Sequence, residues 1–220
     1  MELGYYPITQ NYGYLIDKAP QNVLEELGQQ INELQSDFSK GKKYNNDLAG
    51  EIKHEYKIFT QPQTKQYIKN LSQRFENESH YISSNYNPLP TLRIDNDIWV
   101  NFQKKYEYNP LHRHGGVLSY VFWYQIPFLF ENEQKYNYKD NKKNPSKHGK
   151  FEFQVPSPSN KKYQITNYTL DIDKTKEGYA TIFPASLQHT VYPFYSSDKY
   201  RITVAGNIMD NNDSLHDGYR

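Results

Sequence analysis

The chain has 220 residues, and its 26 Lys and Arg nearly balance its 25 Asp and Glu, for a net charge of +1. This balance argues against a dedicated nucleic-acid binder, which carries a basic excess, and the absence of cysteine excludes disulfides, thiolate zinc sites and cysteine nucleophiles. The 22 tyrosines and 11 phenylalanines set the chain apart from disordered proteins, although its mean hydropathy is −0.98. We therefore expect a globular domain whose apolar mass lies in aromatic rings.

Membrane attachment is not expected from the sequence. No stretch approaches the roughly 20 apolar residues that span a bilayer. Residues 1–10 lack the basic region and the long apolar run of a signal peptide. A cytoplasmic protein is therefore predicted.

Two helices are predicted in residues 1–90, a mixed helical part of the chain. The first follows Pro20, which suits a first helical turn, and ends before Gly41. Its apolar residues recur at helical spacing: Val23, Leu24, Leu27, Ile31 and Leu34. A second pattern of this kind consists of Tyr67, Ile68, Leu71 and Phe75. We expect both helices to cover a sheet, and we assign them no chemistry.

Short strands are predicted after Pro90, each rich in β-branched or aromatic residues and bounded by turn formers. Their ranges are 92–94, 98–102, 117–127, 151–155, 163–170, 179–183, 190–194 and 201–207. About eight such strands are typical of a sandwich or jelly roll. We expect one domain over residues 1–208, with its β core at 91–208, a solvated polar loop at 131–150 and a polar tail at 209–220.

Three histidines are candidates for a metal site. His112 and His114 are two residues apart in N-P-L-H-R-H-G-G, and side chains at this spacing leave the same face of an extended segment. Their rings could therefore converge on one point, although two surface histidines in a turn would give the same pattern. His189, in F-P-A-S-L-Q-H-T-V-Y-P, begins a predicted strand, where a lone histidine is more often a hydrogen-bonded polar group than a ligand.

A candidate carboxylate receptor follows twelve residues after His189. Arg201 and Thr203 share a strand face by the same alternation. A guanidinium binds a carboxylate through two parallel hydrogen bonds, and a hydroxyl adds a further donor. A strand arginine taken alone is more often part of a surface ion pair.

Taken together, these motifs resemble the Fe(II)- and 2-oxoglutarate-dependent oxygenases. The resemblance rests on W-V-N-F, N-P-L-H-R-H-G-G-V-L-S-Y-V-F-W and F-P…H-T-V-Y-P-F…Y-R-I…G-N, between Trp99 and Asn207. More narrowly, these motifs look like a branch common in tailed phages, notably marine ones. The resemblance implies a mainly β fold with flanking helices and a double-stranded β-helix, that is, a cupin-like jelly roll. For a phage protein, the expected location is the host cytoplasm.

The resemblance implies that His112 and His189 are the two histidine ligands of Fe(II). The family's carboxylate ligand falls on His114, so the third ligand here would be neutral. Three alternatives stay open: His114 supports the ligands from behind, an acidic residue elsewhere completes the site, or the metal is not iron. Asp171 and Asp173 are the nearest downstream acids.

The resemblance also implies a binding site for 2-oxoglutarate. Arg201 would bind its distal carboxylate, with Thr203 assisting. Asn101, Tyr120 and Tyr124 are further candidates for hydrogen bonds to this cosubstrate, although packing in an aromatic core would also explain the two tyrosines.

The implied activity is that of a dioxygenase that hydroxylates a C–H bond and releases succinate and CO2. Its partners would be dioxygen and a prime substrate that the sequence does not identify, and a homo-oligomer stays open. One alternative is a three-histidine, cupin-like dioxygenase independent of 2-oxoglutarate, which would leave Arg201 and Thr203 without a role. Another is a non-enzymatic jelly-roll module of a virus with structural or binding duties.

Overall fold

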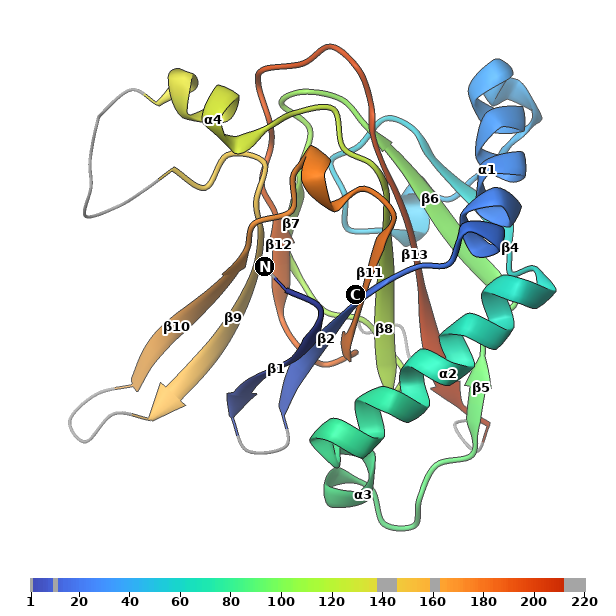
Figure 1. Ribbon diagram of the computed structural model, residues 1–220, viewed down its shortest axis with the longest axis vertical. Helices are drawn as coiled ribbons and strands as arrows, with labels where there is room; N and C mark the ends of the chain where they lie inside the picture. The colour runs from blue at the N-terminus through green and yellow to red at the C-terminus, as the bar shows by residue number, and fades with distance from the viewer. Residues whose placement is uncertain (1, 10–11, 138–145, 159–162, 212–220) are drawn as a thin grey trace.

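Two antiparallel sheets face each other in the computed structural model, which describes residues 2–9, 12–137, 146–158 and 163–211 (Figure 1). The strands of the larger sheet, in spatial order, are β1 (Gly4–Thr9), β2 (Tyr12–Lys18), β11 (Tyr179–Pro184), β8 (Leu118–Gln125), β13 (Arg201–Asp210), β6 (Asp97–Gln103), β4 (Glu55–Phe59) and β3 (Lys42–Lys43), with β5 (Leu92–Ile94) also paired to β13. Those of the smaller sheet are β10 (Tyr163–Leu170), β9 (Phe151–Pro158), β12 (His189–Val191) and β7 (Asn109–His112). This is the double-stranded β-helix that the family resemblance implies.

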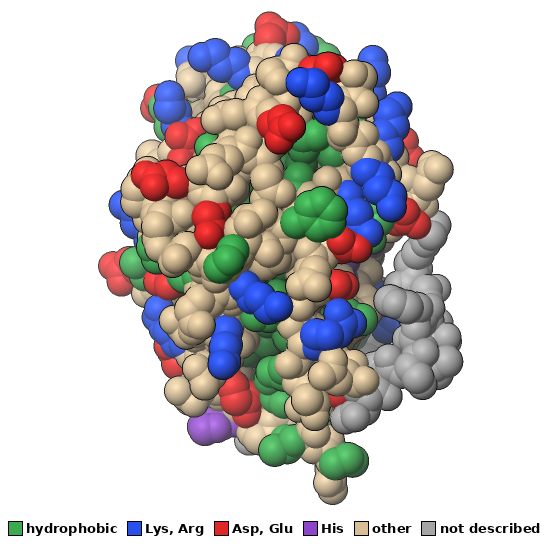
Figure 2. Space-filling view, turned by 90° about the vertical axis from the view of Figure 1, so that its right-hand side faces the viewer, with side chains coloured by type: hydrophobic (Ala, Val, Ile, Leu, Met, Phe, Trp, Pro, Cys, Tyr) green, Lys and Arg blue, Asp and Glu red, His purple; other side chains and the backbone are tan. Residues whose placement is uncertain are grey.

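Two long helices cover the outer face of the larger sheet, as expected (Figure 1). They are α1 (Gln21–Ser36) and α2 (Pro62–Ser79). The short helix α3 (Tyr81–Asn85) follows α2 and buries Tyr81 and Ile82 in the same core, and the other short helix is α4 (Phe130–Glu133). The apolar stripe of α1 is buried at Val23, Leu27, Ile31 and Leu34. On the face that carries these helices, acidic and basic side chains are intermixed, in keeping with the near-zero net charge (Figure 2). Among the described residues, no helix is long and apolar enough to cross a membrane.

The alternation of β8 divides the interior into two cores. Leu118, Tyr120 and Phe122 pack against the helices, whereas Val121 and Trp123 point between the two sheets. Both faces of this strand are therefore buried. Side chains on this strand point into the space between the sheets from the alternate positions that include Val121 and Trp123.

The N-terminal part is more β-rich than the helical patterns alone indicate. β1, β2 and β4 all join the larger sheet, so this part of the chain is continuous with the core. Most predicted strands are found within a residue or two of their expected ends. The strand expected at 190–194 instead ends at Val191, two residues before Pro193.

Two expectations for polar segments need correction. The interval 131–150 is not simply a solvated loop, because Glu133 is 1% exposed and accepts hydrogen bonds from the main-chain N–H groups of Tyr195 and Ser196. The tail expected from residue 209 begins later, since β13 runs through Asp210. The residues 138–145 of the loop and 212–220 of the tail lie outside the described residues.

Candidate active site

Three histidine rings meet between the two sheets. A ligand atom from each of His112, His114 and His189 lies within 4.8 Å of the others. The ring centroids of His112 and His189 are 4.2 Å apart, and that of His114 lies 5.0 and 5.1 Å from them. This arrangement places three imidazoles around one point, which is the geometry that metal chelation requires.

Strand pairing brings these histidines together. β12 runs antiparallel to β7, and His189 pairs directly with His112, the last residue of β7. His114 lies beyond the end of the strand, where its main-chain N–H donates to the carbonyl of Ala185. Gly116 then adopts a φ of +95°, which a residue with a Cβ rarely adopts, and the chain enters β8.

Hydrogen bonds fix the orientation of two of the rings. The Nδ1–H of His112 donates to the carbonyl of Pro110 at 2.7 Å, and that of His189 donates to the carbonyl of Leu187 at 2.9 Å. With the proton held on Nδ1, the Nε2 lone pair is available to a metal, as is usual for histidine ligands. Burial lowers the pKa of all three histidines below the ordinary value, which keeps the rings neutral.

The donor set of this cluster is entirely nitrogen. Among the described residues, no carboxylate joins the three histidines. Asp171 instead pairs with Lys150, and Asp173 caps a short turn by accepting from the N–H of Thr175. Neutral imidazole suits Fe(II), so the residues present fit an iron ion.

Arg201 lies on β13 inside the same β-helix and is 1% exposed. Its guanidinium lies against the stacked pair of Phe128 and Phe194, at 5.7 and 5.5 Å from the centroids of their rings. It donates hydrogen bonds to Gln103 and to the carbonyls of Gly149 and Tyr192, and none of these acceptors is charged. Burial lowers the pKa of Arg201 to about 9, so the group remains a cation at neutral pH. The charge of the buried Glu133 opposes this shift, but its carboxylate accepts hydrogen bonds from Tyr195 and Ser196. No carboxylate is among the hydrogen-bond acceptors of the guanidinium named above, so a cosubstrate can supply one.

Thr203 and Asn101 lie opposite each other on β13 and β6 and line a cavity that also contains the three histidines. Both side chains are nearly buried, and Asn101 Oδ1 has no hydrogen-bond partner among the described residues. Gln103 and Asn109 line the same cavity, and the motif analysis missed them. Gln103 could have been found, because it follows Asn101 by two residues and therefore shares its face.

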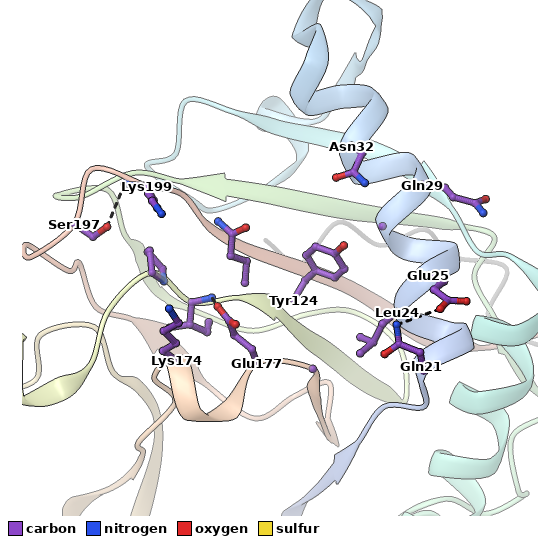
Figure 3. Close-up of a pocket in the computed structure, with 15 residues that line it drawn as sticks. Gln21, Leu24, Glu25, Gln29, Asn32, Tyr124, Lys174, Glu177, Ser197 and Lys199 are labelled. Carbon is purple, nitrogen blue, oxygen red and sulfur yellow. Dashed lines mark hydrogen bonds between the residues drawn. The ribbon is translucent and has the colours of Figure 1, made fainter.

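Tyr124 is not brought to the histidines, whereas Tyr120 is one of the residues that line the histidine cavity. Both belong to the core between the larger sheet and the helices, on the opposite face of β8. Figure 3 shows Tyr124 in a separate surface groove beside α1, together with Leu24 and Glu177. The core-packing alternative therefore accounts for Tyr124, whereas Tyr120 belongs to this core and also lines the histidine cavity.

A buried carboxyl group, Glu55, lies behind the cavity. It is fully buried on β4 and pairs with Asn101 across the sheet. The side-chain oxygens Asn109 Oδ1 and Glu55 Oε1 both lie next to Gly50. A Cβ atom built on this glycine would be 2.3 Å from the first and 2.6 Å from the second. Neither oxygen has a hydrogen-bond partner among the described residues. Burial and the charge of Glu107 raise the pKa of Glu55 to about 8, so the group is mostly protonated at neutral pH and can act as a donor.

The raised pKa of Glu55 predicts a specific pH dependence of stability. Because the folded pKa lies above the ordinary value of 4.5, the folded state binds this proton more tightly than the unfolded state does. The free energy of unfolding should therefore fall as the pH rises from about 5 to about 8, by up to about 1.4 kcal/mol per pH unit. In Glu55→Gln this contribution disappears. Urea unfolding of both proteins across that range measures it, and two parallel pH profiles would contradict the assignment.

A double-stranded β-helix that gathers three neutral histidines beside a buried arginine defines the chain as a non-haem metal oxygenase. Residues 97–207, half of the chain, match the model of a family described as "Putative 2OG-Fe(II) oxygenase". The chain belongs to this family: it is a non-haem iron oxygenase whose cofactors are Fe(II) and 2-oxoglutarate. This membership favours a 2-oxoglutarate-dependent enzyme over a non-enzymatic module and over a dioxygenase independent of 2-oxoglutarate.

Solved structures support the same fold. A prolyl-4-hydroxylase from Pseudomonas putida superposes with a TM-score of 0.54 at 9% identity, over 90% of this chain and 93% of that one. A prolyl hydroxylase from Trichoplax adhaerens, in complex with a peptide fragment of the hypoxia inducible factor oxygen degradation domain, gives 0.50 at 13% identity, over 90% and 83%. A search of curated protein sequences found no match. At these identities the likeness concerns the fold, and the phage branch stays a prediction.

Proposed function

We propose that His112, His114 and His189 hold Fe(II) through their Nε2 atoms. This proposal rests on three neutral histidines whose candidate ligand atoms lie within 4.8 Å of one another. Hydrogen bonds from Nδ1 orient two of the rings. In this proposal His114 takes the position that a carboxylate fills elsewhere in the family. The bound ion then keeps its full 2+ charge, because none of its protein ligands is an anion.

Arg201 is proposed to bind the distal carboxylate of 2-oxoglutarate. Its guanidinium is a buried cation whose present acceptors are all neutral, so a carboxylate gains charge-assisted hydrogen bonds there. Thr203 and Asn101 line the cavity of the three histidines. The hydroxyl of Thr203 and the amide N–H of Asn101 can donate hydrogen bonds to the cosubstrate there.

The proposed reaction is hydroxylation of a C–H bond. Fe(II) and 2-oxoglutarate, when bound, supply the oxidising chemistry, with dioxygen as oxidant and succinate and CO2 as products. The protein's part is to orient the cosubstrate through Arg201, to keep the histidines neutral and to exclude water with the aromatic walls of the cavity, which include Trp99, Trp123 and Phe151. A reactive oxidant is protected from side reactions in such an enclosed site.

Succinate formation tests this function. Purified protein supplied with Fe(II), 2-oxoglutarate and dioxygen should form succinate slowly alone, and faster with a substrate that fits. The substrate screen includes prolyl peptides, because the two structural neighbours are prolyl hydroxylases by name. Mass spectrometry should then detect one added oxygen atom in the substrate. Iron-dependent oxidation of a substrate without consumption of 2-oxoglutarate would contradict the proposal.

A further inference from the structure

Gln103 stands between Arg201 and the histidine cavity. Its Oε1 accepts one hydrogen bond from Arg201 Nε at 3.0 Å and another from Nη2 at 2.7 Å. These two donors form the edge of the guanidinium that a carboxylate ordinarily engages in the fork arrangement. The neutral amide oxygen of Gln103 thus occupies the edge of Arg201, formed by Nε and Nη2, at which a carboxylate could bind through two hydrogen bonds.

The other acceptors of Arg201 are parts of the main chain. They are the carbonyls of Gly149 at 2.7 Å and Tyr192 at 2.9 Å, which receive bonds from Nη1 and Nη2. Both segments are tied down by main-chain bonds, Gly149 N–H to the carbonyl of Pro193 and Tyr192 N–H to that of Lys150. Of the described partners of Arg201, Gln103 is therefore the one that can leave by a side-chain rotation, which also breaks the hydrogen bond from its Nε2 to the carbonyl of Glu107.

The size of the cavity requires such a movement. It offers about 50 Å³, and Gln103 lines it whereas Arg201 does not. That volume accommodates only a few water molecules, so a five-carbon dicarboxylate needs a side chain to give way. Rotation of Gln103 both enlarges the cavity and opens the path to the guanidinium.

We propose that Gln103 is a displaceable placeholder whose amide oxygen holds the place on Arg201 that the distal carboxylate of 2-oxoglutarate takes. This inference rests on the proposed role of Arg201. The exchange is favourable because hydrogen bonds to a charged acceptor are about twice as strong as those to a neutral one. Before the cosubstrate binds, the amide oxygen accepts hydrogen bonds from two N–H groups of the buried cation, and leaving these donors without that acceptor would be costly.

Gln103→Glu tests the proposal, because it supplies a carboxylate that stays attached to the protein. We expect its affinity for 2-oxoglutarate to fall at least about thirtyfold, while its affinity for Mn(II) stays within about twofold. Binding is measured anaerobically with Mn(II) as the metal. The fluorescence of Trp99 and Trp123 reports it, since these are the two tryptophans of the chain and both line the cavity.

Gln103→Met keeps the test decisive if the glutamate variant does not fold. It removes the competing acceptor and both of its hydrogen bonds with Arg201 in the unbound state, so 2-oxoglutarate should bind more tightly, by at least about tenfold. The variant should also melt at a lower temperature without 2-oxoglutarate and regain more stability with it. Gln73→Glu, on the exposed face of α2, adds the same charge elsewhere and should behave as the wild type.

The outcomes separate this inference from the proposed function. Wild-type affinity for 2-oxoglutarate in Gln103→Glu, or weaker binding in Gln103→Met, would overturn the placeholder role and leave the iron site and Arg201 untouched. A wild-type protein that binds Mn(II) but not 2-oxoglutarate would overturn the role proposed for Arg201, and the placeholder with it.

Discussion

His189→Ala should lose Fe(II) binding and, with it, 2-oxoglutarate turnover. His189 is 3% exposed, and its ring is the closest neighbour of His112 within the cluster, at 4.2 Å between centroids. Its removal leaves two imidazoles, and the affinity for metal should fall at least about 100-fold, since even the loss of a residue that only supports a ligand costs 10–100-fold. Chelator competition followed by metal analysis measures this loss.

His80→Asn is the matched control for this substitution. His80 is exposed at the end of α2 with a φ of 53°, which asparagine tolerates, so the change removes an imidazole without straining the backbone. It should bind iron as the wild type does. If His189→Ala retained wild-type affinity for Fe(II) while remaining folded, the histidine cluster would not be the metal site.

Arg201→Met should bind iron normally and lose 2-oxoglutarate. Methionine still packs against Phe128 and Phe194 but carries no charge, so the affinity for 2-oxoglutarate should fall at least about 100-fold, the cost of removing one partner from a buried charge pair. Arg201→Lys keeps the charge without the fork and should show an intermediate loss. Anaerobic titration calorimetry with Mn(II) present measures both affinities.

The same variant carries a cost in stability. The carbonyls of Gly149 and Tyr192 lose their Arg201 donors, and unfolding should become easier by about 1–3 kcal/mol. Arg93→Met, which breaks a surface pair with Asp95, is the matched control and should leave 2-oxoglutarate binding unchanged. Wild-type affinity for 2-oxoglutarate in Arg201→Met would show that the carboxylate binds elsewhere.

Local patterns predicted much of this fold because its elements have distinct periods. The 3.6-residue repeat located α1 and α2, and the spacing of His112 and His114 placed both rings on one side of an extended segment. The meeting with His189 required the pairing of β7 with β12, which joins residues far apart in the sequence. A family resemblance, and not the periodicity, linked these segments before the structure did.

The side chains on β8 show where alternation alone fails. Both faces of this strand are buried and aromatic, so the sequence offers no polar face from which to set the phase. In the structure, the side chains of Tyr120 and Tyr124 lie on the face of β8 toward the helices, and that of Trp123 lies on the face toward the histidines. Glu55 was missed for a different reason: its role depends on burial against Asn101 and Asn109, which no local motif records.

The central claim is that three neutral histidines, without a carboxylate, hold Fe(II) for use with 2-oxoglutarate. Anaerobic titration of the protein with Fe(II) and 2-oxoglutarate tests it most directly, followed by the weak visible charge-transfer band of their complex. The account predicts a band that saturates at one iron per chain in the wild type and disappears in His114→Leu. A wild-type protein without the band, or a His114→Leu variant that keeps it at full strength, would contradict the account.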